Sequence, residues 1–385
     1  MDGTLFHTKG HKHVPAGLLE RWYGVEKINH LSECLRTFPM PVPLLDAPGK
    51  VWVMPGGDFV GSLKAGSEMS ALDRAMDVLR RHRAAARIRG GRVQHGRLNA
   101  FASLDALIAA ATGGKAQYLN FAKTGVAASA TGGTMDMWTR GTVPAAGAAG
   151  GALPGGTSPT NATTGNLGWA NPASANTGHL LAIEATASII NNSLMLTDRL
   201  FAAAINPNTT ATQSVTGTFA RYQSGTSTAA DYIGGNFIYP SNPTTVLAAT
   251  AHNYDAVQYT DQGSTTAQQC PTTTGISACP VGQVDIAVGA NSWHLPFASG
   301  DVGCKALTQV KLSAAVATGT MDMVVAHMIG LIGFPVALHV CIADSLYTAL
   351  QLTSVFDDAC LNFMEMPKPA TTATTYSGRV SLVAE

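Results

Sequence analysis

The second part of this chain carries very few charged side chains. From Ala111 to Glu385 it has only nine Lys or Arg and fourteen Asp or Glu, in a background rich in Ala, Gly, Thr, Ser and Asn. An ordinary soluble domain is about a quarter charged, and mixed surface charge keeps soluble molecules apart. We therefore expect much of this surface to be covered in the working state, by further copies of the chain or by partner proteins.

The distribution of charge and the number of cysteines give further expectations about the chain and its environment. Its 385 residues have no net charge, but residues 1–110 carry a net charge of +5 and residues 111–385 one of −5. The first residues form no apolar secretory signal, so we expect a reducing cytoplasm and free thiols for most of the six Cys. Cys270 and Cys279 are close enough in sequence for a disulfide, and spacing alone does not decide between bond and thiols.

One apolar stretch is long enough to span a bilayer. Residues 323–343 contain no Asp, Glu, Lys or Arg. Pro335 lies near the middle of this stretch, with Gly330 and Gly333 beside it. Turn-forming and isolated polar residues are costly in lipid, so we expect two buried strands joined by a turn.

Residues 1–110 have the pattern of a helical, Arg-rich arm or domain. Apolar residues near Ile28 have helical spacing, and a capped helix is expected from Ser70 to Gly90. A further helix from about Ser103 to Ala111 is expected to bury Leu104, Leu107 and Ile108. A short strand is expected at residues 50–54.

Arginine is the most distinctive charged residue of this arm. Eight Arg lie between Arg74 and Arg97, with Asp77 as the only acid among them. Such a run is compatible with contact to a neighbouring subunit, a solvated helix face or nucleic acid. Subunit contact is preferred, because the remainder of the chain is net acidic and no aromatic residues are interleaved for base stacking. The candidate subunit-contact residues are Arg80, Arg81, Arg83, Arg87 and Arg89.

Beyond residue 110 the apolar period changes to two, which is typical of strands. Residues 180–185 alternate and lead through Asn191-Asn192 into residues 193–197, a pattern that predicts a β-hairpin. Seven further strands are expected, and the first of them is the weakest because it contains Gly217. These strands are Val215–Phe219, Asn236–Tyr239, Val284–Val288, Leu307–Leu312, Met321–Ala326, Ala337–Ile342 and Val380–Val383.

Two further features of this region bear on its organisation. Val143–Gly178 is the most extreme of its Gly/Thr/Asn/Pro loops, and we expect it to become ordered only against a neighbouring subunit. Residues 127–137 resemble residues 314–323, and both segments end in Met-Asp-Met. Two related turns that each feed a strand of one sheet system would explain this echo, and so would chance in such a biased composition.

The sequence offers little material for catalysis. It contains no phosphate-binding Gly loop and no His-Glu-x-x-His, Gly-x-Ser-x-Gly or Cys-x-x-Cys motif. His7, His11 and His13 lack accompanying ligands, which favours a solvated arm over a metal site. Tyr254 and Tyr259 are compatible with a glycan-binding surface, although a strand with outward Tyr is commoner. We expect no catalytic, cofactor-binding or metal-binding residues.

Several segments between Leu104 and Met364 share the pattern of known proteins. They are Tyr118–Gly125, the Ala/Gly/Pro loop after Trp138, Leu194–Leu200, Val257–Gln262 and Leu295–Gly303. In these segments the chain resembles structural proteins of tailed bacteriophage virions. The resemblance implies a β-sandwich shell, decoration or tail component, and it leaves out the first 100 residues.

Together these features predict a mainly β protein. We expect an antiparallel β-sandwich of jelly-roll type at residues 111–385, after a helical arm at residues 1–110. The resemblance implies a repeated structural subunit of the virion, made in the host bacterial cytoplasm, as a capsid or capsid-decoration protein. Two alternatives stay open: the major shell protein of the tailed-phage capsid fold, with residues 70–90 as its spine helix, and a receptor- or glycan-binding tail component.

The expected partners follow from the same features. They are copies of the chain itself and other virion proteins, with nucleic acid as a less favoured partner. We expect no membrane, small-molecule substrate or cofactor.

Overall fold

The computed structural model divides the chain into two compact units, Met1–Arg92 and Val93–Glu385. In the second unit it describes residues 101, 103–129, 132–173, 177–223, 235–287, 293–344, 352–366 and 372–385. In the first unit it describes the backbone of two short hairpins. They are β1 (Leu5–Phe6) with β2 (Val14–Pro15), and β3 (Val51–Val53) with β4 (Phe59–Ser62).

Strand β3 confirms the short strand expected at residues 50–54. The other expectations for the arm fall outside the described residues. These are the helices near Ile28 and Ser70, the His7, His11 and His13 group, and the candidate contact residues Arg80, Arg81, Arg83, Arg87 and Arg89.

The second unit opens with helix α4 (Leu104–Ala110), although its sequence groups it with the arm. Ser103 caps the helix, because its side chain accepts a hydrogen bond from the Ala106 amide at 3.1 Å. One wider helical turn, η1 (Ala111–Lys115), continues the chain as far as Gly114, whose φ of 85° ends the helix. Leu107 is buried, but Ile108 is 51% exposed, so the expected burial of Ile108 is wrong.

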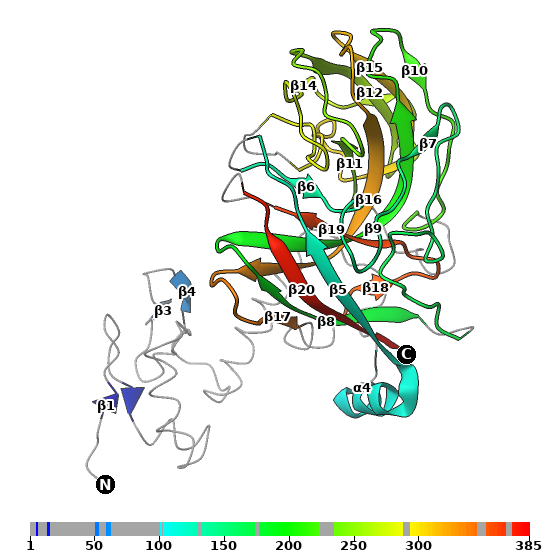
Figure 1. The fold of residues 1–385 in the computed structure, drawn as a ribbon. Helices are drawn as coiled ribbons and strands as arrows, with labels where there is room; N and C mark the ends of the chain where they lie inside the picture. The colour runs from blue at the N-terminus through cyan, green and yellow to red at the C-terminus, as the bar shows by residue number, and fades with distance from the viewer. Residues whose placement is uncertain are drawn as a thin grey trace. The chain divides into compact units, whose positions relative to one another are not determined.

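Three sheets of largely antiparallel strands make up the rest of the second unit, which confirms the mainly β prediction. The six-stranded sheet has the order β11-β16-β9-β19-β6, and β7 lies parallel to β9. Its strands are β6 (Met135–Asp136), β7 (Gly151–Ala152), β9 (Asn192–Ile205), β11 (Asn236–Ser241), β16 (Met321–Phe334) and β19 (Leu361–Glu365). Figure 1 shows β9 and β16 as its long central pair.

Two smaller sheets complete the fold, and we name each by its central strands. The β8–β20 sheet has the order β17-β8-β20-β5 with β18 beside β8, and the β12–β15 sheet has the order β10-β15-β12-β13 with β14 beside β12. The first contains β5 (Ala116–Thr124), β8 (Gly178–Ala187), β17 (Cys341–Asp344), β18 (Ser354–Val355) and β20 (Thr375–Ala384). The second contains β10 (Gln213–Ser214), β12 (Asn253–Asp261), β13 (Gln268–Gln269), β14 (Thr273–Thr274) and β15 (Cys304–Leu312).

The predicted hairpin at residues 180–197 is wrong, although both of its strands exist. Strand β8 pairs with β17, β18 and β20, whereas the edges of β9 are occupied by β16 and β19. The chain therefore crosses between two sheets at Asn191, which has a φ of 59°. Gly330 of β16 faces Leu180 and Ile183 of β8, and a side chain at that glycine would come within 2.6 Å of Leu180. Strand β8 thus packs on the face of β16.

Two other expected strands are also wrong. Residues 215–219 lie beyond the end of β10, and a Cβ on Gly217 would approach the Gly155 carbonyl to 1.9 Å. Residues 215–219 therefore form a loop whose backbone packs closely against the loop that contains Gly155. Val284 forms only an isolated bridge with Ser241, so the described residues near it form no strand of their own. The strands expected at residues 236–239, 307–312, 321–326 and 380–383 are confirmed.

The uncharged stretch at residues 323–343 forms parts of β16 and β17 joined by a turn, as expected. The strand expected at residues 337–342 is wrong for its first four positions, because residues 335–340 form the turn and β17 begins at Cys341. The predicted burial of the uncharged stretch is wrong at Met328 and Leu331 of β16, which are 45% and 47% exposed, and at Leu338, Val340 and Ile342, which are 62–77% exposed. Among the described residues, no helix is long and apolar enough to cross a membrane.

Candidate functional site

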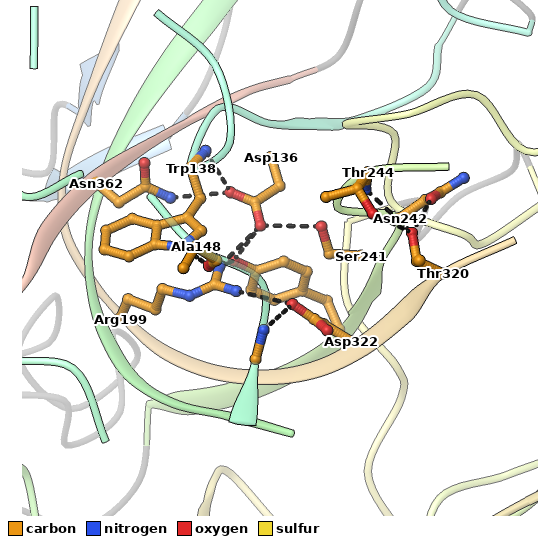
Figure 2. A network of polar contacts seen from close by, with 12 residues as sticks. Asp136, Trp138, Ala148, Arg199, Ser241, Asn242, Thr244, Thr320, Asp322 and Asn362 are labelled. Atoms are coloured by element: carbon orange, nitrogen blue, oxygen red, sulfur yellow. Dashed lines mark hydrogen bonds and ion pairs between the residues drawn. The ribbon is translucent and has the colours of Figure 1, made fainter. Parts of the chain in front are cut away.

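Arg199 of β9 lies at the centre of a buried polar network. One terminal nitrogen of its guanidinium lies 2.8 Å from Asp136 Oδ2 and 3.2 Å from the Tyr239 hydroxyl. The other terminal nitrogen lies 3.7 Å from Asp322 Oδ2. The guanidinium also lies over the Trp138 ring, 5.0 Å from its centroid, a cation–π arrangement. Figure 2 shows how these side chains converge.

Asp136 of β6 is the main acceptor of this network. Its two carboxylate oxygens accept five hydrogen bonds, from strands β9, β11 and β19 and from its own turn. The donors are the Trp138 amide (3.0 Å), Asn362 Nδ2 (2.9 Å), Arg199 (2.8 Å), the Tyr239 hydroxyl (3.2 Å) and the Ser241 hydroxyl (3.0 Å). A buried carboxylate requires such partners, because an unpaired charge in the interior is very costly. A single side chain thereby fixes three strands to β6.

The same network holds the long loop that begins at Val143. Asp322 accepts a hydrogen bond from the Gly150 amide at 2.6 Å, and the Trp138 indole donates to the Ala148 carbonyl at 2.6 Å. Farther along, the Thr157 amide donates to the Ala202 carbonyl at 2.8 Å. The expectation that this loop is ordered only against a neighbour is therefore wrong. Its backbone groups find their partners within their own unit, which removes the need for a neighbouring subunit.

The two Met-Asp-Met segments of the sequence echo meet at Arg199. Asp136 comes from the first segment and Asp322 from the second, and each segment enters a strand of the six-stranded sheet. Each is preceded by a glycine with positive φ, 86° at Gly132 and 122° at Gly319. The structure therefore agrees with the interpretation of two related turns that each feed a strand.

Burial and neighbouring charge shift the pKa values of three side chains of this network, Arg199, Tyr239 and Asp322. Burial lowers the pKa of Arg199, but Asp136, Tyr239 and Asp322 outweigh that effect and hold it above its ordinary value. Burial raises the pKa of Tyr239 well above its usual range and also raises that of Asp322. These three side chains and Asp136 are at most 2% exposed. The network therefore stabilises the fold and presents no group to a substrate.

A second buried cluster has the composition of an acid–base pair. His252 Nε2 lies 2.8 Å from Asp285 Oδ2, and His252 Nδ1 lies 3.0 Å from the Thr250 carbonyl. Tyr254 donates to the same Asp285 oxygen at 2.6 Å. Burial raises the pKa of the nearby Cys279 thiol well above its ordinary value, so this Cys is not an activated nucleophile. Both nitrogens of the imidazole are engaged within the protein, which assigns this cluster to packing.

The structure also places the other residues considered from sequence. Cys270 and Cys279 are separate buried thiols. Tyr254 and Tyr259 are buried, which corrects the expectation of outward Tyr side chains. Their hydroxyls donate to Asp285 and Asp301, each at 2.6 Å. Among the described residues, no group of three or more His, Cys, Asp or Glu is placed to hold a metal ion.

An exposed apolar surface lies at one edge of the β8–β20 sheet, and we call it the β17 flank. Strand β17 is an edge strand of this sheet, next to β8 (Figure 1). The amides of Leu338 and Asn191 donate to the Ala187 and Phe334 carbonyls at 2.8 Å, which brings the β16–β17 turn against the loop after β8. The flank consists of Ile190, Val336, Leu338, Val340 and Ile342, which are 45–77% exposed.

Among the described residues, this flank is a candidate interaction surface that the sequence did not predict. The sequence feature that marks this surface is the uncharged stretch at residues 323–343. A buried strand would explain that stretch equally well. Comparisons with protein-family models, with curated proteins and with solved structures find no match to this chain. The fold and the surface define a mainly β protein with an internal polar network and one exposed apolar sheet edge.

Proposed function

We propose that this chain is a structural subunit of a bacteriophage particle, a capsid or capsid-decoration protein that works by self-assembly. One observation carries the proposal: folding does not concentrate the few charged residues at the surface. Of the 20 charged residues after residue 110 whose burial the structure describes, eight are buried inside the second unit. They are Lys123, Asp136, Asp198, Arg199, Asp261, Asp285, Asp322 and Glu365.

Such a surface favours association over free solution. Mixed surface charge normally keeps protein molecules apart, and a surface with few charges lacks that protection. Contacts between copies would then be mostly apolar and uncharged. The resemblance to tailed-phage virion proteins indicates what kind of assembly this would be, a particle built from many copies of the chain.

The geometry bears on one of the two alternatives. A glycan-binding tail component was motivated by Tyr254 and Tyr259, which are buried. A shell protein of the tailed-phage capsid fold depends on a spine helix at residues 70–90, outside the described residues.

Sedimentation velocity on the purified full chain tests the proposal. We expect species larger than a monomer at micromolar concentrations. Association through the second unit should persist when salt is raised, because its surface carries few charges, whereas any contribution from the Arg run should weaken. A stable monomer at high concentration and moderate salt would refute the assembly role.

A further inference from the structure

Leu338 occupies an unfavourable position in the turn between β16 and β17. Its φ is 60°, in the left-handed region that residues other than glycine seldom adopt, and its side chain is 77% exposed. A glycine would satisfy this turn without strain and without placing a large apolar group in water. The turn therefore carries two costs that folding of the single chain does not explain. Local strain of this kind points to a functional role.

The backbone next to Leu338 offers a second contact element. Strand β17 pairs with β8 along one side, and among the described residues no strand pairs with its other side. A free strand edge carries amide and carbonyl groups that can pair with another strand. Two copies of the same short strand can pair antiparallel across a two-fold axis, which makes the edge complementary to itself.

The size and charge of the β17 flank also suit a contact between identical chains. Its five side chains together expose as much surface as about three fully exposed ones. At roughly 150 Å² each, the lower end for a large buried side chain, they offer on the order of 450 Å². A standard interface buries about 800 Å² on each partner, of which about 60% is apolar. Residues 323–343 carry no formal charge, and β17 ends at Asp344. In an antiparallel pair centred on β17 the two Asp344 lie at opposite ends of the contact, so like charges are not placed opposite each other.

The other large apolar residues that the structure describes as exposed are less so than Leu338, Val340 and Ile342. Ile108, Tyr118, Val143, Met328 and Leu331 are 45–57% exposed. Val246 and Val302 are about half exposed, but Val246 lies in the loop after β11 and Val302 in the loop before β15. Single apolar residues of this kind are normal on a protein surface. The β17 flank differs because apolar side chains, a strained turn and a free strand edge coincide there.

We propose that the β17 flank is a two-fold contact between copies of this chain, with β17 of one copy antiparallel to β17 of the next and Leu338 as the anchor on each side. This assignment rests on the proposed self-assembly and names the surface that performs it.

The test compares three variants of the full chain with the wild type by sedimentation velocity and thermal unfolding. Leu338→Gly removes the anchor and relieves the backbone. Val340→Lys places a charge on the flank, and Val246→Lys is the matched control on a separate loop. We expect the first two variants to weaken association at least tenfold and the control to associate like the wild type. Leu338→Gly should also unfold at the same temperature as the wild type or higher.

The contrary outcomes are distinct. If the wild type associates and both flank variants associate equally well, assembly uses another surface and this inference fails while the proposed function stands. If Leu338→Gly lowers the unfolding temperature without changing association, the flank is covered within one chain and the inference fails. If the wild type is monomeric at every protein concentration, both the proposed function and this contact are refuted.

Discussion

Replacing Arg199 with Met tests the role of the buried polar network. The change removes the cation between two buried carboxylates while it keeps an unbranched side chain of similar length. Asp136 retains four of its five donors, whereas Asp322 retains the Gly150 amide as its described donor. Removal of one partner from a buried ion pair costs about 3–5 kcal/mol, so we expect a loss of that size in unfolding free energy at pH 7.

Urea unfolding of the full chain, followed by tryptophan fluorescence, measures this loss. Protein concentration must be low and fixed, because association adds to apparent stability. The matched control is Arg379→Met, which breaks an exposed ion pair with Glu184 and should change the unfolding free energy little. An Arg199→Met variant that loses no more stability than this control would refute the reasoning.

The pH dependence of the same variant supplies a second check. Burial raises the folded-state pKa of Asp322, so its charged form opposes folding above that pKa and the cost disappears as the carboxyl is protonated. Without Arg199 this pKa should rise further. The destabilisation should therefore shrink as the pH is lowered from 7 toward the raised pKa of Asp322. Arg199→Met combined with Asp322→Asn should recover about 1–3 kcal/mol.

Three further predictions follow from other parts of the second unit. Burial lowers the pKa of Lys123 from 10.5 to about 8, so the unfolded chain binds more protons at this residue between these values. The wild type should therefore gain unfolding free energy relative to Lys123→Met as pH rises across that window, as measured by urea unfolding of both proteins. Gly217→Ala should cost about 1–3 kcal/mol because its Cβ would meet the Gly155 carbonyl, whereas Gly155→Ala has open space and should be neutral by the same assay. Hydrogen exchange should show the Gly150 and Thr157 amides protected in the free chain, and fast exchange there would mean that the loop orders only on assembly.

Apolar periodicity predicted where many strands lie but not which strands pair. Alternation along residues 180–185 defines the two faces of β8, and it carries no information about its edges. Both edges of β9 are taken by β16 and β19, which are distant in sequence. The short turn at Asn191 therefore joins two sheets, although its residues would equally suit a hairpin.

The buried polar network was only partly visible in the sequence. The echo at Asp136 and Asp322 marked both acids, but nothing in it identified Arg199 as their shared partner. A single Arg within the apolar run of β9 was the available signal, since Arg is seldom fully buried without a partner. Burial of Tyr254 could not be anticipated, because its acceptor Asp285 lies 31 positions away along the chain.

The β17 flank was missed for a different reason. An uncharged run of this length fits a buried strand and an exposed contact surface equally well, and only the fold separates the two. The left-handed turn at Leu338 has no sequence signature, because glycine or Asn would ordinarily mark it.

Cryo-electron microscopy of the purified full chain tests the central claim most directly. The account predicts regular multi-copy particles in which neighbouring second units meet through uncharged surface, with pairs of β17 strands antiparallel across local two-fold axes. A field of separate single chains at micromolar concentration would contradict it.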